Sequence, residues 1–152
     1  MIFSRISLLA ITLVLSAATG PVGSHPHYLD ALTDLRLARA LLQTPDQAKA
    51  EKFEKTAIDD IDQALAEIKH AAIDDGKNLD DHPPIDANVS HQDRLNQILK
   101  LVQAANRDLN FDEDDQKALG WRARAIKDGA DAQAFVEAAI SNDKPPTNKR
   151  GG

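Results

Sequence analysis

The strongest hydrophobic pattern in the chain lies between Thr44 and His82. Apolar residues recur there at spacings of three and four, which places them on one stripe of a helix, and Lys, Glu, Asp and Gln fill the opposite face. Thr44-Pro45-Asp46-Gln47 has the order of a capping box, and Gly76 suits a helix C-cap, so we expect a helix over 44–75. Its stripe consists of Phe53, Ala57, Ile61, Ala64, Leu65, Ile68 and Ala72.

Three further amphipathic stripes predict three more helices. The first runs from about residue 25 to 43, with Pro26 at a position where helices tolerate proline. A second capping box, Ser90–Asp93, opens a helix that reaches Leu109, and a last helix is expected over about 113–141. On the other faces of the first of these helices, Asp30, Asp34, Arg36 and Arg39 are expected to pair. The apolar positions of the three helices, in chain order, are Tyr28, Ala31, Leu32, Leu35, Ala38 and Leu42; Leu95, Ile98, Leu99, Val102, Ala105 and Leu109; and Leu119, Ala123, Ile126, Ala130, Val136 and Ile140.

Four helices with single apolar stripes and short or moderate connections predict an all-α protein, an antiparallel up-down-up-down four-helix bundle. The last helix is the weakest, because Gly120 and Gly129 each cost about 1 kcal/mol relative to Ala. The stretch 77–89 is rich in Pro, Asn and Asp and is typical of a loop. The tail 142–152 is predicted to be disordered, so the bundle is expected to span 25–141.

The first eighteen residues have the order of a secretory signal peptide. Arg5 supplies the positive start, Ile6–Leu15 form an apolar run, and small residues follow. The run is too short for a membrane span, which needs about 20 apolar residues. Cleavage after Ala18 is favoured because it is nearer the apolar run, and cleavage after Ser24 is the alternative. We therefore expect an exported protein, periplasmic or secreted, in which 19–24 form a linker.

Composition narrows the classes of partner. The chain has 152 residues and a net charge of −6, and removal of Arg5 with the signal peptide leaves 17 basic against 24 acidic residues, a net charge of −7. This balance argues against nucleic acid, whose phosphates need a basic surface. The absence of Cys from the sequence excludes disulfides, thiolate metal sites and covalent c-type haem. A partner protein or a second copy of the chain remains, with no membrane span after signal removal.

In the predicted topology, all five histidines gather at one end of the bundle. His25 and His27 begin the first helix, His70 lies in the last turns of the second, His82 lies in the loop and His91 begins the third. Imidazole with carboxylate is the ligand set for Zn, Cu or Ni where thiolates are missing. The candidate ligands of a divalent transition metal are therefore His25, His27, His70, Asp74, His82 and His91.

These residues also have ordinary explanations. His70 and Asp74 are four apart, so they can chelate together or simply form a salt bridge at a helix C-terminus. Cleavage after Ser24 would make His25 the N-terminus and offer half of a copper histidine brace. No catalytic residue is predicted, since the sequence lacks G-x-S-x-G, a phosphate-binding Gly loop and H-E-x-x-H. Glu67 and His70 form one Glu-x-x-His pair, but a di-iron bundle needs two.

Short motifs resemble a family of small exported bacterial proteins of uncharacterised role. They are His25-Pro26-His27-Tyr28-Leu29, Ala31–Arg36, Ile73-Asp74-Asp75-Gly76-Lys77 and Asp81-His82-Pro83. The resemblance implies a helical secreted protein and adds no catalytic residues. Two hypotheses follow: an exported non-catalytic bundle with a structural or partner-binding role in the cell envelope, or a metal-binding bundle that uses the His and Asp residues above.

Overall fold

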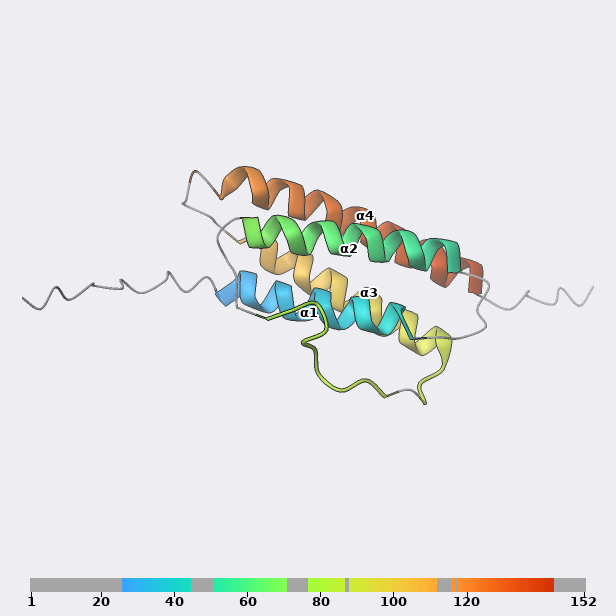
Figure 1. Cartoon of the computed structure of the whole chain (residues 1–152). Helices are drawn as coiled ribbons and strands as arrows, with labels where there is room; N and C mark the ends of the chain where they lie inside the picture. The colour runs from blue at the N-terminus through green and yellow to red at the C-terminus, as the bar shows by residue number, and fades with distance from the viewer. Residues whose placement is uncertain are drawn as a thin grey trace, which may run out of the picture.

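A computed structural model describes residues 26–44, 51–70, 77–86, 88–111, 116 and 118–143. These residues form four helices that pack side by side as a bundle (Figure 1), and no strand occurs among them. The all-α four-helix prediction is therefore confirmed. The helices are α1 (Pro26–Leu42), α2 (Glu51–His70), α3 (His91–Leu109) and α4 (Leu119–Asp143).

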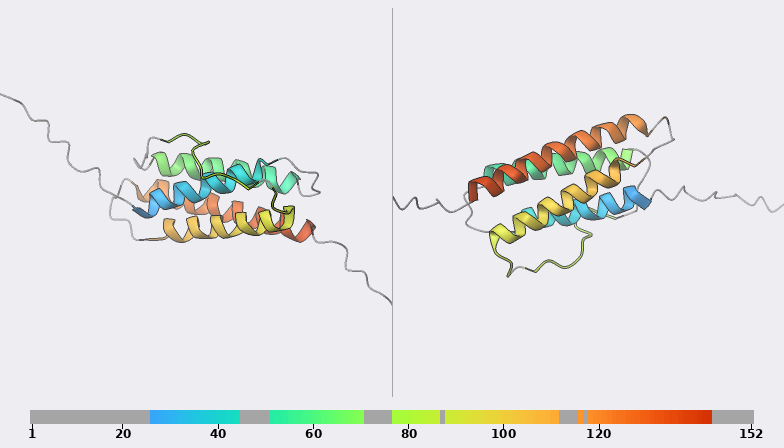
Figure 2. Two further views of the ribbon diagram at one scale, coloured as in Figure 1. Left: turned by 90° about the horizontal axis from the view of Figure 1, so that it is seen from below. Right: turned by 180° about the vertical axis from the view of Figure 1, so that it is seen from behind.

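The order of helix directions differs from the prediction. Figures 1 and 2 show α1 and α4 running one way along the bundle and α2 and α3 running the other way. Neighbours in contact are antiparallel: α1 packs on α2 and α3, and α4 packs on the same two helices. The parallel pairs, α1 with α4 and α2 with α3, lie on the diagonals. The chain therefore runs up-down-down-up, and the predicted up-down-up-down order is wrong.

The long connection between α2 and α3 explains this order. Twenty residues separate His70 from His91, and an extended chain of that length reaches roughly 66 Å, far more than the roughly 28 Å length of a 19-residue helix. The described part of this loop lies along α1, where Asp80 is 3.7 Å from Arg39 and a hollow brings residues 80–83 beside Thr33. The connection thus returns to the end where α2 began, and α3 starts there.

The buried faces of the first three helices agree with the predicted stripes. All six predicted positions of α1 are buried, and in α2 and α3 only Phe53 and Leu99 are half-buried, while Ala72 lies outside the described residues. Arg36 departs from the prediction, because its side chain is fully buried in the bundle and does not lie on a polar outer face. Its hydrocarbon stem lets a charged residue contribute to a core.

The buried face of α4 is not the one predicted. Only Val136 belongs to both sets; Ala123 and Ala130 are exposed, and Ile126 and Ile140 are half-buried at the edges. The observed inner face consists mostly of small residues, which let the backbone of α4 approach its neighbours closely and leave larger side chains to cover the edges. The residues buried are Ala125, Gly129, Ala132, Val136 and Ala139.

Helix ends follow the predicted capping only in part. Ser90 is the N-cap of α3, and its hydroxyl oxygen accepts a hydrogen bond of 3.2 Å from the Asp93 amide. α4 begins at Leu119, later than predicted, and ends at Asp143. The predicted capping box at 45–47, the C-cap at Gly76, the signal peptide 1–18, the linker 19–24 and the tail from 144 lie outside the described residues.

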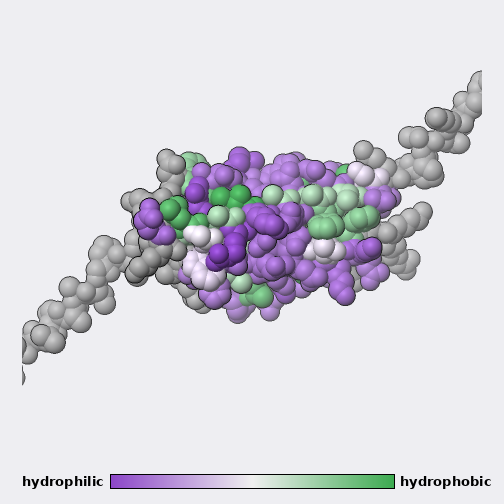
Figure 3. Space-filling view, turned by 90° about the horizontal axis from the view of Figure 1, so that it is seen from above, coloured by the Kyte–Doolittle hydropathy of each residue, from purple (hydrophilic) through white to green (hydrophobic). Residues whose placement is uncertain are grey.

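The face of the bundle on which α4 lies in Figure 1 is mainly hydrophilic. Figure 3, which looks down on the side where α4 lies in Figure 1, shows hydrophobic areas that are small and separated by polar residues. No described helix is long and apolar enough to cross a membrane. Among the described residues, the large hydrophobic side chains that remain exposed are Leu29, Leu79 and Phe111, and Phe111 is the most exposed at 52%.

Candidate functional site

The observed topology separates the histidines that the sequence placed at one end. His27 and His70 lie at the end of the bundle where α1 begins and α2 finishes. His91 lies at the opposite end, where its Nε2 is 3.4 Å from Glu54 in the first turn of α2. His82 lies between them, in the hollow beside Thr33 of α1, and its Nδ1 is 2.8 Å from the Pro83 carbonyl oxygen. The prediction that all histidines share one end is wrong.

This separation bears on the metal hypothesis. One ion cannot be bound by residues at opposite ends of the bundle, because metal–ligand bonds are about 2 Å long. Among the described residues, no group of three or more His, Asp or Glu side chains could hold a metal ion. His25 and Asp74 lie outside these residues, so metal binding that involves them stays a prediction.

A hydrogen-bonded turn that carries Phe111 follows the last residue of α3. The C-cap Asn110 donates its side-chain amide to the Asn106 carbonyl oxygen at 2.7 Å, and its backbone N–H bonds to the carbonyl oxygen of Arg107 at 3.1 Å. The Phe111 amide then donates to the Asp108 carbonyl oxygen at 3.3 Å. These bonds satisfy carbonyl groups that the helix end leaves open. They also fix the direction in which Phe111 leaves the helix.

The Phe111 ring is further held by the first turn of α1. It stacks on the His27 imidazole with centroids 3.6 Å apart and planes at 5°. His27 Nδ1, at the edge of the imidazole, lies 3.7 Å from Asp108 Oδ1. The outer face of Phe111 remains open to solvent. An aromatic ring is thus exposed in a fixed orientation, at a point where α1 and α3 meet.

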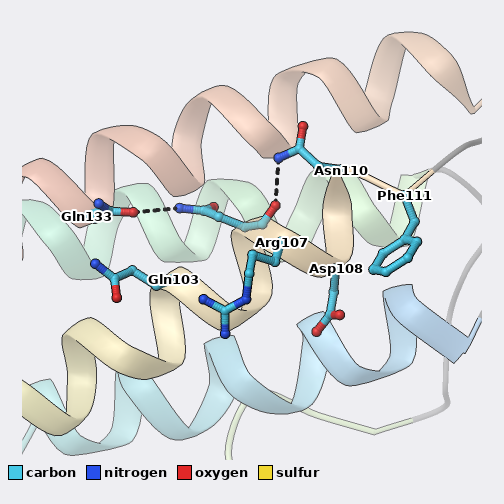
Figure 4. Close-up of a pocket in the computed structure, with 7 residues that line it drawn as sticks. Gln103, Arg107, Asp108, Asn110, Phe111 and Gln133 are labelled. Atoms are coloured by element: carbon cyan, nitrogen blue, oxygen red, sulfur yellow. Dashed lines mark hydrogen bonds between the residues drawn. The ribbon is translucent and has the colours of Figure 1, made fainter.

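A groove of about 640 Å³ begins at this ring and follows α3 toward α4. Figure 4 shows Arg107 and Asp108 extending from the last turn of α3, Phe111 from the turn that follows it, and Gln133 reaching in from α4. Asn106 closes the α4 side, because its side-chain amide donates to the Gly129 carbonyl oxygen at 3.1 Å and to Gln133 Oε1 at 3.3 Å. The groove therefore has one apolar end and walls of amide and charged side chains.

The electrostatics beside the groove are dominated by carboxylates. Burial raises the pKa of Asp34 on α1, and the nearby charges of Asp108 and Asp30 raise it further, whereas Arg107 lowers it. Carboxylates from α1 and α3 thus face one another across the helix interface. The rim beside Phe111 is acidic, with Arg107 as the cation that moderates it.

A second aromatic stack lies at the same end, between α2 and α4. His70 stacks on Trp121 with centroids 4.6 Å apart, and the Arg124 guanidinium lies 4.0 Å from the centre of the Trp121 ring. Arg124 Nε also donates to Glu67 Oε2 at 2.8 Å. The stack covers the edge of the core, where Trp121 is half-buried. Its groups are engaged with one another, so it reads as a structural contact.

At the opposite end, α2, α3 and α4 bring ionisable side chains together. His91 Nε2 lies 3.4 Å from Glu54 Oε1 and 3.9 Å from Asp143 Oδ2. His91 Nδ1 lies 3.0 Å from Arg94 Nη2, and Arg94 is itself buried. Burial raises the pKa of Glu54 despite the opposing effect of His91, and Asp143 and Glu51 raise it further.

No family model matches the chain, and no curated protein or solved structure matches it either.

Sequence reasoning missed the Phe111 turn and the Glu54 cluster. Phe111 stands in an otherwise polar turn, and a large apolar residue in such a place is a signal of a contact surface. Glu54 lies next to Phe53 on the edge of the predicted stripe, and periodicity gives no sign that a carboxylate there is buried. Both features depend on which helix ends meet, which the pattern of one helix does not specify.

Proposed function

We propose that the protein is an exported, non-catalytic helical bundle that binds a partner protein through the groove beside Phe111. The observation that carries this proposal is the orientation of Phe111, whose ring is 52% exposed although it is stacked flat on His27. Aromatic side chains are frequent anchors of protein interfaces. An anchor that is already fixed in the free protein loses little side-chain entropy on binding, which favours affinity.

The surroundings of Phe111 indicate the chemistry of the partner. Asp108 lines the groove, the charges of Asp108 and Asp30 both act on Asp34 of α1, and the whole chain carries a net charge of −6. A partner with an apolar pocket for the ring and basic residues around it would be complementary. A second copy of this chain would bring a like-charged rim to the same place, so the acidic rim favours a different protein.

The proposal is tested first by export and then by site-specific cross-linking in the native cell. The intact mass of the exported chain is expected to show loss of residues 1–18. A photoreactive residue in place of Gln103 or Gln133, which line the groove, is expected to give one adduct of defined mass. The same residue in place of Gln63, exposed on α2, is the control and should give none.

Phe111 variants connect the adduct to the anchor. Phe111→Ser is expected to abolish the adduct, and Phe111→Tyr to preserve it, because both aromatic rings can fill an apolar pocket. Neither change should lower the melting temperature by more than about 2 °C, because surface substitutions have small effects on stability. An adduct that is equally strong from Gln63, or unaffected by Phe111→Ser, would contradict the proposal. An adduct of twice the chain mass would show self-association instead.

A further inference from the structure

A second groove continues the Phe111 groove along α3. It also has a volume of about 640 Å³, and Gln103 lines both grooves. Val89 and Asp93 line its far end, where α3 begins. The right-hand view of Figure 2 shows no described segment crossing the outer side of this helix. The two grooves together, which we call the α3 groove, therefore provide room for a linear segment along most of α3.

Two exposed cations line the central part of the α3 groove. Neither Lys100 nor Arg107 forms an ion pair with any residue that the structure describes, although the charge of Arg107 acts on Asp34 of α1. The carboxylates that line the groove lie at its two ends: Asp93, which accepts a hydrogen bond of 2.6 Å from the Ser90 hydroxyl, and Asp108, which lies beside Phe111. The centre of the groove is therefore positive in a chain whose net charge is −6, and acidic side chains are complementary to it.

The spacing of these cations selects the conformation of the bound segment. Lys100 and Arg107 are seven positions apart, so they lie two turns, or about 10.5 Å, apart along α3. A helix that lies beside α3 presents residues seven positions apart on one face at the same spacing. In an extended segment, side chains on one face are about 6.7 Å or about 13.4 Å apart, so their spacing does not match. A helix is therefore the segment that can face both cations.

Apolar side chains lie toward both ends of the α3 groove. Phe111 follows Arg107 by four positions, and its ring is 52% exposed. Leu99, which is half-buried, and Val89 line the part of the groove near the start of α3. An amphipathic helix can bury its apolar face against these residues while its acidic residues face the cations between them.

We propose that the α3 groove binds an amphipathic helix of the partner protein, in which two acidic residues seven positions apart face Lys100 and Arg107. Apolar residues about one turn beyond the acidic residue that faces Arg107 receive the Phe111 ring. The basic residues that complement Asp108 lie at that same end, so the helix is basic beside Phe111 and acidic in its middle. This inference rests on the proposed function, because it describes the partner that binds at Phe111.

Photo-cross-linking from two points of the groove measures the conformation of the bound segment in the native cell. A photoreactive residue in place of Asn96 should give an adduct of the same mass as one in place of Gln103, because both residues line the α3 groove. Peptide mapping should place the two attachment sites about seven residues apart in one partner segment. Sites about three residues apart would indicate an extended segment and would overturn the inference. So would adducts on an anionic polysaccharide.

Charge reversal tests the acidic residues of the partner. Lys100→Glu with Arg107→Glu should lower the yield of the Gln103 adduct at least about tenfold, because two attractions become repulsions. Lys100→Arg with Arg107→Lys keeps both charges and should preserve the adduct. The matched control is Lys52→Glu with Lys55→Glu, which changes the net charge by the same amount on two exposed residues of α2 and should leave the yield unchanged.

The outcomes separate this inference from the proposed function. An adduct that is lost in Phe111→Ser but keeps its yield after the double charge reversal would retain the anchor and overturn the acidic helix. The absence of any adduct from Gln103 would contradict the proposed function itself. Because Arg107 acts on Asp34, its reversal can disturb the bundle, which a circular dichroism melt would reveal. Lys100→Glu alone should then lower the yield about fivefold, and an unchanged yield would overturn the inference.

Discussion

Gly129 is the position where the packing of α4 makes the sharpest prediction. A methyl group added there would collide with Asn106 Oδ1 and lie 3.3 Å from Asn106 Cγ. Asn106 could not move away without losing its hydrogen bonds to the Gly129 carbonyl oxygen and to Gln133. Helix propensity alone predicts the opposite result, because Ala is favoured over Gly by about 1 kcal/mol inside a helix. The sign of the effect therefore tests the packing.

The magnitude follows from these competing terms. Two lost hydrogen bonds cost about 1 kcal/mol each, and overpacking of a close contact costs about 1–3 kcal/mol. After the gain in helix propensity of about 1 kcal/mol is subtracted, Gly129→Ala should lower the free energy of unfolding by about 2–4 kcal/mol. Gly120→Ala is the matched control. Its new methyl would make only an ordinary 3.9 Å contact with Arg124, so it should stabilise the protein by about 0.5–1 kcal/mol.

Urea unfolding followed by far-UV circular dichroism measures both variants on one scale. The double variant Gly129→Ala with Asn106→Ala removes the collision, so the two substitutions should be coupled by about 1 kcal/mol or more. If Gly129→Ala is as stable as the wild type, and Gly120→Ala has the same free energy of unfolding, the close approach of α3 and α4 is refuted.

Two further predictions concern charges inside the bundle. Burial, with Asp131 and Asp128 nearby, raises the pKa of Asp60, so the folded state binds more protons than the unfolded state as the pH falls from the raised pKa toward 3.8. The free energy of unfolding should therefore increase on mild acidification and decrease again as the pH rises. Asp60→Asn should reduce this pH dependence, which urea titrations at several pH values measure. An unchanged pH dependence in the variant would contradict a raised pKa at Asp60. Arg36→Ala should lower the free energy of unfolding by about 3 kcal/mol or more, because removal of a fully buried long side chain leaves a cavity. A loss below about 1 kcal/mol would show that Arg36 is not part of the core.

Much of each helix could be predicted from local pattern. The stripes of α1, α2 and α3 are buried as predicted, because apolar spacing of three and four fixes which face of a helix avoids water. Ser90 caps α3 because a hydroxyl before a helix satisfies an open backbone N–H whatever the fold. Periodicity failed in α4, where Ala residues and Gly129 form the inner face. Such small residues give almost no hydropathy contrast, so the choice of face depends on how closely α2 and α3 approach.

The candidate site could not be predicted from the hydrophobic pattern of the helices. Periodicity marks neither Phe111 nor Glu54 as a candidate site residue, and a simple reversal of the chain after α2 would bring all the histidines to one end. That connection instead returns along α1, which moves His91 away from His27 and next to Glu54. A loop of this length can reach either end of the bundle, so its course cannot be derived from its own composition.

The sequence alone determined that this chain forms four amphipathic helices and where α1 and α3 begin and end. These properties depend on interactions between residues a few positions apart. Only the tertiary structure decided the up-down-down-up order, the stacking of Phe111 on His27, and the sharing of one imidazole by Glu54 and Asp143. Each of these joins residues from different helices. Their contacts depend on which helix ends are brought together when the apolar stripes are buried against one another.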